Sequence, residues 1–274
     1  HRDLHLSLRR QRQMCIRDRG STEQKALFYA IASDLVRTTE TQVAVVTGLP
    51  VGEFNDRNKT TLREMLVGTH IVRRQGKRTR RFTVTGCYIV PQAFGALLYL
   101  VLDRRGRLID NDLAGGRVGI VDIGLLTTNF VLADRLRYVE VQSDSITTGM
   151  AEALRKIAKE LRDRYNLDWT LQLPRVDRAV RDRVVEVYGD RVNIAGLVDP
   201  HLGALAETIV SKAHSLWGGG ADLRAVVLTG GGSLEMAPYV RKTYPHTRTV
   251  SNDPQFANAM GYLRAGLRRF GGIN

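Results

Sequence analysis

Two short apolar runs, each ending in a glycine turn, constrain the fold of this 274-residue chain more than any other feature. The first is VGIVDIG at 118–124, which resumes through Thr127 and Thr128, and the second is AVVLTGGGS at 225–233. Runs of this kind are typical of strands buried in the centre of a sheet. Asp, Gly and Thr also suit an ordinary hairpin, so the first run alone does not separate a turn from a binding loop.

The three consecutive glycines Gly230 to Gly232 indicate more than a turn. Glycine weakens strands and helices, so such a run is expected where another group must approach the backbone closely. Glycine turns after apolar strands are also typical of phosphate-binding loops, because backbone amides can approach the anion there. The P-loop pattern and the protein-kinase motifs are absent, and a hairpin rather than a helix follows GGRVGIVDIG, which excludes a dinucleotide fingerprint.

Strand and helix patterns alternate along the chain, which predicts an α/β fold with mixed sheets. A short apolar strand is expected in TQVAVVTGLP at 41–50. Amphipathic spacing predicts helices over 23–37, 147–165, 176–188 and 199–217, with a last helix near the C-terminus. Residues 69–90 read as a hairpin that carries Arg73, Arg74, Lys77, Arg78, Arg80 and Arg81. These cations fit a solvated edge strand, and an anionic partner is the alternative.

The net charge of +13 is not evenly spread, because the first nineteen residues hold six arginines and two aspartates. MCIRDR at 14–19 looks like a translated sequencing adapter, so residues 1–19 are treated as an artefact and excluded from the fold. The two cysteines, Cys15 and Cys87, form no disulfide framework and no metal-type spacing. With no apolar run of membrane-spanning length, we expect a cytoplasmic protein that does not contact membranes.

Five segments in a fixed order carry a resemblance to a known family: VVTGLPV, VPQAFGALL, VDIGLLTTNF, VVLTGGGSLEMAP and DPQFANAMGYLRAG. From about Gln42 to its end, the chain resembles the actin-like ATPases, and above all the ParM/StbA type that segregates plasmids. The resemblance implies an actin-like (ribonuclease H-like) two-lobed ATPase fold with mixed sheets. Residues 20–117 would be the remainder of lobe I, 118–256 lobe II, and 257–274 a closing helix that returns to lobe I.

The resemblance also implies a site for ATP and Mg²⁺ between the lobes. Asp122 would hold Mg²⁺ through water, Gly124 would approach the β-phosphate, and Thr127 and Thr128 would face the γ-phosphate. Gly230, Gly231, Gly232 and Ser233 would form the adenosine loop. Gln92 would orient the attacking water, a task that suits a neutral amide in phosphoryl transfer. Lys159 and Glu160 would lie near the adenine or ribose.

The chain departs from the family pattern in two ways. Leu125 and Leu126 follow Asp-x-Gly where glycine or polar residues are usual, and Asn129 replaces a closing acid. The family's first phosphate loop has no counterpart before Gln42, which predicts an N-terminally truncated fragment with an incomplete first lobe. Such a fragment is expected to be inactive as an ATP hydrolase.

The leading hypothesis is a cytoskeletal ATPase that forms head-to-tail filaments with its own copies and moves plasmid DNA through an adaptor protein. A nucleotide-binding scaffold with little turnover is the first alternative, suggested by Leu125, Leu126 and Asn129. A metabolite kinase of the same superfamily is the second. Direct binding of nucleic acid through Arg73 to Arg81 is the least favoured.

Overall fold

The computed structural model describes residues 22–36, 41–73, 79–168, 172–250 and 253–271, which form two compact units. The first unit contains residues up to Leu49, Glu53–Val90, and the residues from Arg269 onward. The second contains Pro50–Gly52 and Pro91–Arg268. Within the described ranges, no helix is both long and apolar enough to cross a bilayer. The proposed adapter segment at 1–19 lies outside these ranges, and the division into lobes stays a prediction.

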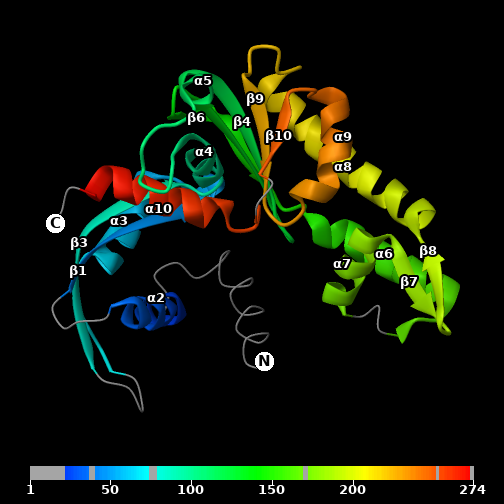
Figure 1. Ribbon diagram of the computed structural model, residues 1–274, viewed down its shortest axis with the longest axis horizontal. Helices are drawn as coiled ribbons and strands as arrows, with labels where there is room; N and C mark the ends of the chain where they lie inside the picture. The colour runs from blue at the N-terminus through cyan, green and yellow to red at the C-terminus, as the bar shows by residue number, and fades with distance from the viewer. Residues whose placement is uncertain (1–21, 37–40, 74–78, 169–171, 251–252, 272–274) are drawn as a thin grey trace. The chain divides into compact units, whose positions relative to one another are not determined.

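The first unit is a three-stranded sheet covered by a helix (Figure 1). Its strands are β1 (Thr41–Leu49), β2 (Gly68–Val72) and β3 (Arg80–Pro91), in the order β1-β3-β2. Helix α2 (Thr22–Leu35) packs its aromatic residues on Phe82 and Val84 of β3. Between β1 and β2 the chain forms a short 3-10 turn, η1 (Val51–Glu53), and then helix α3 (Asp56–Leu66). The predicted hairpin is confirmed, because β2 pairs antiparallel with β3. Its basic turn at 74–78 lies outside the described residues.

The second unit is built on a five-stranded mixed sheet in the order β10-β9-β4-β5-β6 (Figure 1). The strands are β4 (Arg117–Ile123), β5 (Thr128–Asp134), β6 (Arg137–Ile146), β9 (Ala225–Thr229) and β10 (Thr247–Thr249). Strands β4, β9 and β10 run parallel, while β5 and β6 complete an antiparallel meander with β4. The mixed sheet is therefore as the sequence predicts.

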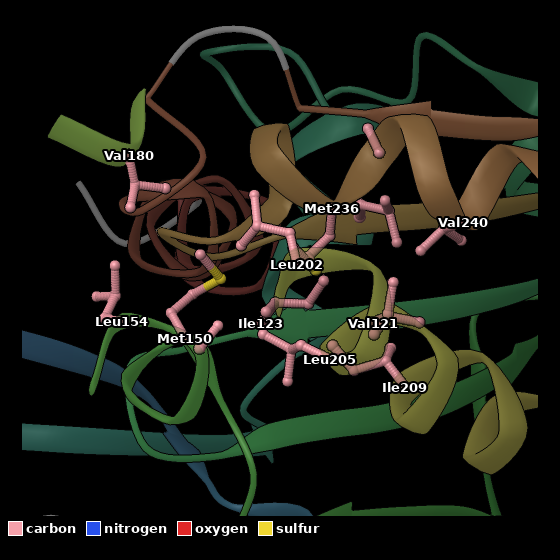
Figure 2. Packing of buried hydrophobic residues seen from close by; sticks show 14 of the residues in the cluster. Val121, Ile123, Met150, Leu154, Val180, Leu202, Leu205, Ile209, Met236 and Val240 are labelled. Carbon is pink, nitrogen blue, oxygen red and sulfur yellow. The ribbon is translucent and has the colours of Figure 1, made fainter. Parts of the chain in front are cut away.

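Side chains of β4 alternate between two apolar cores, one on each face of the sheet. Val121 and Ile123 face the core formed with α6 (Met150–Tyr165), α7 (Leu173–Asp182), α8 (Ala195–Trp217) and α9 (Ser233–Thr243). Figure 2 shows Met150, Leu202 and Met236 closing over them. Val118 and Ile120 face the core formed with α4 (Phe94–Val101), α5 (Asn111–Gly115) and α10 (Ala257–Phe270). Burial of the strand on both faces is the reason that the run at 118–121 is continuously apolar, up to Asp122.

Two predicted helices have different bounds in the structure. The helix predicted over 176–188 ends at Asp182, because Arg183 adopts a left-handed conformation with φ of 54°. The β-branched run that follows pairs as β7 (Val184–Val187) with β8 (Asp190–Asn193). The helix predicted from residue 199 begins earlier, at Ala195, whose amide donates to the Asn193 side chain, and it continues through Pro200.

Candidate functional site

The two glycine turns lie next to each other at one edge of the large sheet. Because β4 and β9 are parallel neighbours with Asp122 opposite Thr229, the chain leaves both strands at the same end. We call residues 124–128 the first corner and Gly230–Gly232 the second corner. The amide of Gly232 donates to the carbonyl of Ile123 at 3.0 Å, which joins the two. The structure thus brings together the two segments that the sequence separates by about a hundred residues.

Glycine is required at the start of the second corner. Gly230 has φ of +86°, and a β-carbon there would lie 2.4 Å from Oδ1 of Asp122 and 2.5 Å from the Ile123 carbonyl oxygen. A β-carbon on Gly232 would overlap the side chain of Met150. Gly231 differs, since its β-carbon would meet nothing within 4 Å. Open space beside a corner of this kind fits the close approach of a nucleotide, which is the group that the family resemblance implies.

Ser233 closes the second corner rather than facing outward. Its hydroxyl is buried and donates to the Gly230 carbonyl at 2.8 Å, and its amide donates to the same oxygen. Gly230 and Thr229 in turn donate to the carbonyl of Pro254. Any contact between Ser233 and a nucleotide stays a prediction.

The first corner is a tight turn held by the start of α6. The amide of Gly124 donates to the Thr127 carbonyl at 2.9 Å, and the amides of Met150 and Ala151 donate to the carbonyls of Gly124 and Leu125. The side chain of Leu125 packs against the core on the α6 side of the sheet. This leucine, a departure from the family pattern, therefore serves packing.

The two threonines of the first corner have different surroundings. The Thr128 hydroxyl is buried and donates to the carbonyl of Thr148 at 2.8 Å, which holds β5 to the loop before α6. Thr127 is half-buried and contributes its carbonyl to the turn. The role predicted for these residues at the γ-phosphate is not tested by the structure.

Asp122 is a buried carboxylate at the end of β4, with 7% of its surface exposed. Burial raises the pKa of Asp122 to about 6, and a hydrogen bond from the Asn258 side chain partly opposes that rise. The Nδ2 atom of Asn258 lies 2.9 Å from Asp122 Oδ2. Asn258 is in α10, so the segment DPQFANAMGYLRAG, which carries part of the family resemblance, contributes a residue to the same site.

Gln92 lies one turn before α4 and is linked to the site through α10. The Tyr262 hydroxyl donates to the backbone carbonyl of Gln92 at 2.6 Å. Burial and the nearby charge of Asp122 raise the pKa of Tyr262 far above its ordinary value, so the hydroxyl remains a donor. The helices cross at backbone contact, because a β-carbon on Gly261 would lie 1.8 Å from the Gly95 carbonyl oxygen. Gly261 therefore serves the close packing of α10 on α4.

Lys159 and Glu160 are exposed on α6 and are not joined to either corner by any contact among the described residues. Glu160 instead lies 2.8 Å from Nε2 of His201 on α8. Lys159 lies nine residues after Met150, the first residue of α6, which is roughly 13 to 14 Å along the helix. Their role at the adenine or ribose stays a prediction.

Two arginines at or just after the end of α7 contact the second corner or the helix that follows it, and sequence reasoning did not identify them. Arg181 donates to the carbonyl of Gly231 at 2.9 Å and also pairs with Asp177. Arg183 pairs with Glu235 in the first turn of α9 at 2.9 Å and with Asp199 of α8 at 3.2 Å. In the sequence these residues have the spacing of a solvated helix face, so no local signal distinguishes them.

The donor set fits a nucleotide better than a protein-held metal. In the described part of the chain, no three His, Cys, Asp or Glu side chains lie close enough to hold a metal ion together. Asp122 is a single carboxylate between two glycine corners, and the amino end of α9 follows the second corner. A lone carboxylate beside glycine turns suits an Mg²⁺ ion that is held mainly by phosphates and water.

Two family profiles match the chain in order. "Actin like proteins N terminal domain" matches residues 7–95, and "Archaeal actin homologue MreB-like, C-terminal" matches residues 120–242. Among curated proteins, the archaeal actin homologues of Thermoplasma acidophilum and Thermoplasma volcanium are 28% and 29% identical over 265 residues. Each alignment covers 91% of this chain and 77% of the relative.

Solved structures share the fold. A crystal structure of an archaeal actin homologue superposes with a TM-score of 0.77 at 22% identity, covering 92% of this chain and 76% of the other. A complex of that homologue with ADP gives 0.72 at 22% identity, with coverages of 90% and 78%. A 15-stranded ParM filament from Clostridium botulinum gives 0.68 at 22% identity, with coverages of 92% and 76%.

The mixed sheet, its two glycine corners and the two ordered profiles define an actin-like protein. Its curated relatives are archaeal actin homologues, and it shares the fold of ParM. The predicted family and fold class are therefore confirmed.

Proposed function

We propose that this protein is a nucleotide-dependent, filament-forming ATPase that takes part in the segregation of plasmid or other DNA. The observation that carries the proposal is the contact between Asp122 and the second corner, which places a carboxylate beside open, glycine-lined backbone. The ADP complex of an archaeal actin homologue with the same fold supports nucleotide binding. The ParM filament supports self-assembly.

Each residue then has a definite task in binding. The backbone at Gly230 to Gly232 would accept the ribose and α-phosphate, and the amides of the first corner would face the terminal phosphates. Asp122 would hold the water shell of Mg²⁺, an ion that neutralises phosphate charge. Gln92 would orient the attacking water. Arg181 adds a cation beside the second corner.

Self-association would use a head-to-tail contact that does not close into a ring, since such heterologous contacts generate filaments. DNA would be carried by a separate adaptor protein. The packing of Leu125 in the core removes one reason for the alternative of a scaffold with little turnover.

The test combines binding, sedimentation and phosphate release on the full-length protein, which includes the first phosphate loop that the sequence predicts to be missing from this chain. A fluorescent ATP analogue with Mg²⁺ should bind, and the protein should pellet at high concentration with ATP and remain in the supernatant without nucleotide. Binding with no phosphate release would favour the scaffold. A protein that binds no nucleotide and never pellets would overturn the proposal.

A further inference from the structure

The side chain of Asn258 spans two parts of the candidate site that have no sequence proximity. Its Nδ2 donates to Asp122 Oδ2, and its Oδ1 accepts from the amide of Ala96, each at 2.9 Å. The amide orientation is fixed by these partners, because a flipped amide would place oxygen against carboxylate and nitrogen against N–H. A single short side chain therefore contacts both the end of β4 and the first turn of α4.

Helix α4 depends on this contact for its amino end. The first amides of a helix have no partner within the helix, and the residue before α4, Ala93, has no side chain that could cap it. Ala96 is the third residue of α4, the position at which a capping oxygen usually accepts. Besides Asn258, its amide has only a 3.2 Å contact with the Ala93 carbonyl. Asn258 thus supplies the cap from another helix.

The crossing of the two helices makes this reach possible. The paired glycines Gly95 and Gly261 bring the backbones of α4 and α10 into contact, and a β-carbon on Gly95 would lie 2.5 Å from the Asn258 carbonyl oxygen. One turn further along α10, Tyr262 holds the Gln92 carbonyl. Both bonds hold the segment that begins with Gln92.

We propose that Asn258 is a positioning residue that fixes the Asp122 carboxylate and the turn carrying Gln92 relative to each other. Loss of the hydrogen bond between Asn258 and Asp122 should therefore weaken the hydrogen bond between Asn258 and the Ala96 amide. The proposal rests on the proposed function only for the roles of Asp122 and Gln92 in hydrolysis. The mechanical link itself is a property of the ligand-free chain.

The link is tested by amide hydrogen exchange of Ala96 in the absence of nucleotide. Asn258→Ala should accelerate exchange at Ala96 by about tenfold, the effect of losing one net hydrogen bond. Asp122→Ala should also accelerate this exchange, by about threefold or more, although among the described residues Asp122 is linked to α4 only through Asn258. In the double variant, Asp122→Ala should not accelerate exchange at Ala96 beyond the effect of Asn258→Ala alone, because the link through Asn258 is already lost.

Met260→Ala is the matched control, since this side chain lies on the same helix with 40% of its surface exposed. In the Met260→Ala variant, the exchange rate of the Ala96 amide should equal that of the wild type. Exchange in β9 reports whether each variant keeps its fold, and Asn258→Ser replaces Asn258→Ala if the latter does not. Unchanged exchange at Ala96 in Asp122→Ala, or equal acceleration with and without Asn258, would overturn the proposal. Failure of the full-length protein to bind nucleotide would refute the proposed function and leave this result standing.

Discussion

The α-carbon of Gly230 lies so close to Asp122 that a β-carbon would be 2.4 Å from the carboxylate Oδ1. This contact between residues 108 positions apart in the sequence forms the candidate site. It also makes the two corners one structural unit, since displacement of either requires displacement of the other.

Substitution of Gly230 should damage both fold and binding. Gly230→Ala places a side chain at φ +86° and against two oxygens, so we expect a loss of about 2–4 kcal/mol in the free energy of unfolding. Urea unfolding followed by circular dichroism measures it. A variant as stable as the wild type would show that the two corners are not in contact.

Substitution of Gly231 should affect nucleotide binding without affecting stability. Its β-carbon would meet nothing within 4 Å, so Gly231→Ala should change the free energy of unfolding by less than about 0.5 kcal/mol. If the nucleotide approaches this backbone, the added methyl group should weaken binding of the ATP analogue about tenfold or more. Unchanged affinity would place the nucleotide elsewhere.

The crossing of α4 and α10 should not tolerate a methyl group. Gly261→Ala would bring a β-carbon to 1.8 Å from the Gly95 carbonyl, and we expect a loss of about 3 kcal/mol or more. Gly196→Ala in α8 is the matched control, because nothing lies within 4 Å. Alanine there should stabilise the helix by about 0.5–1 kcal/mol. The comparison fails if both variants unfold at the same urea concentration.

Asp122 should make the ligand-free protein more stable in mild acid. Burial raises its pKa from 3.8 to about 6, so the folded state binds the proton more tightly than the unfolded chain. This contribution is fully present below about pH 4 and is lost as the pH rises through about 6. When the pH falls from 7 to 5, protonation of Asp122 should raise the free energy of unfolding by about 1 kcal/mol. When the pH falls below both pKa values, the total gain should be about 3 kcal/mol.

Asp122→Asn removes this titration and serves as the reference. Urea unfolding of both proteins at pH 7 and pH 5 isolates the effect from all other groups. An equal change with pH in the two proteins would contradict the burial of Asp122 as a titrating carboxyl.

Arg183 should stabilise the second corner through α9. Glu235 is only 15% exposed, so Arg183→Met would leave a largely buried carboxylate without its cation and cost about 1–3 kcal/mol. Lys156→Met is the control, because Lys156 and Glu152 form an exposed pair on α6. That variant should lose less than about 0.5 kcal/mol. Thermal unfolding of the two variants under one buffer compares them.

The sequence was sufficient for the local elements of the site. The strands at 118–123 and 225–229 were predictable because the apolar runs that form most of them, 118–121 and 225–228, are typical of strands buried on both faces of a sheet. The glycines of the second corner indicated close approach, and the amphipathic spacing from Met150 predicted α6. These features depend on residues near one another in the chain, where periodicity and backbone preference act directly.

The tertiary structure decided which distant residues meet. The bridge through Asn258, the contact of Arg181 with Gly231 and the pairing of Arg183 with Glu235 all depend on partners far away in sequence. An asparagine or an arginine on a helix has the same local pattern whether it faces solvent or a partner. Packing alone chooses between these states, because the free energy of such hydrogen bonds depends on burial and geometry that only the folded chain provides.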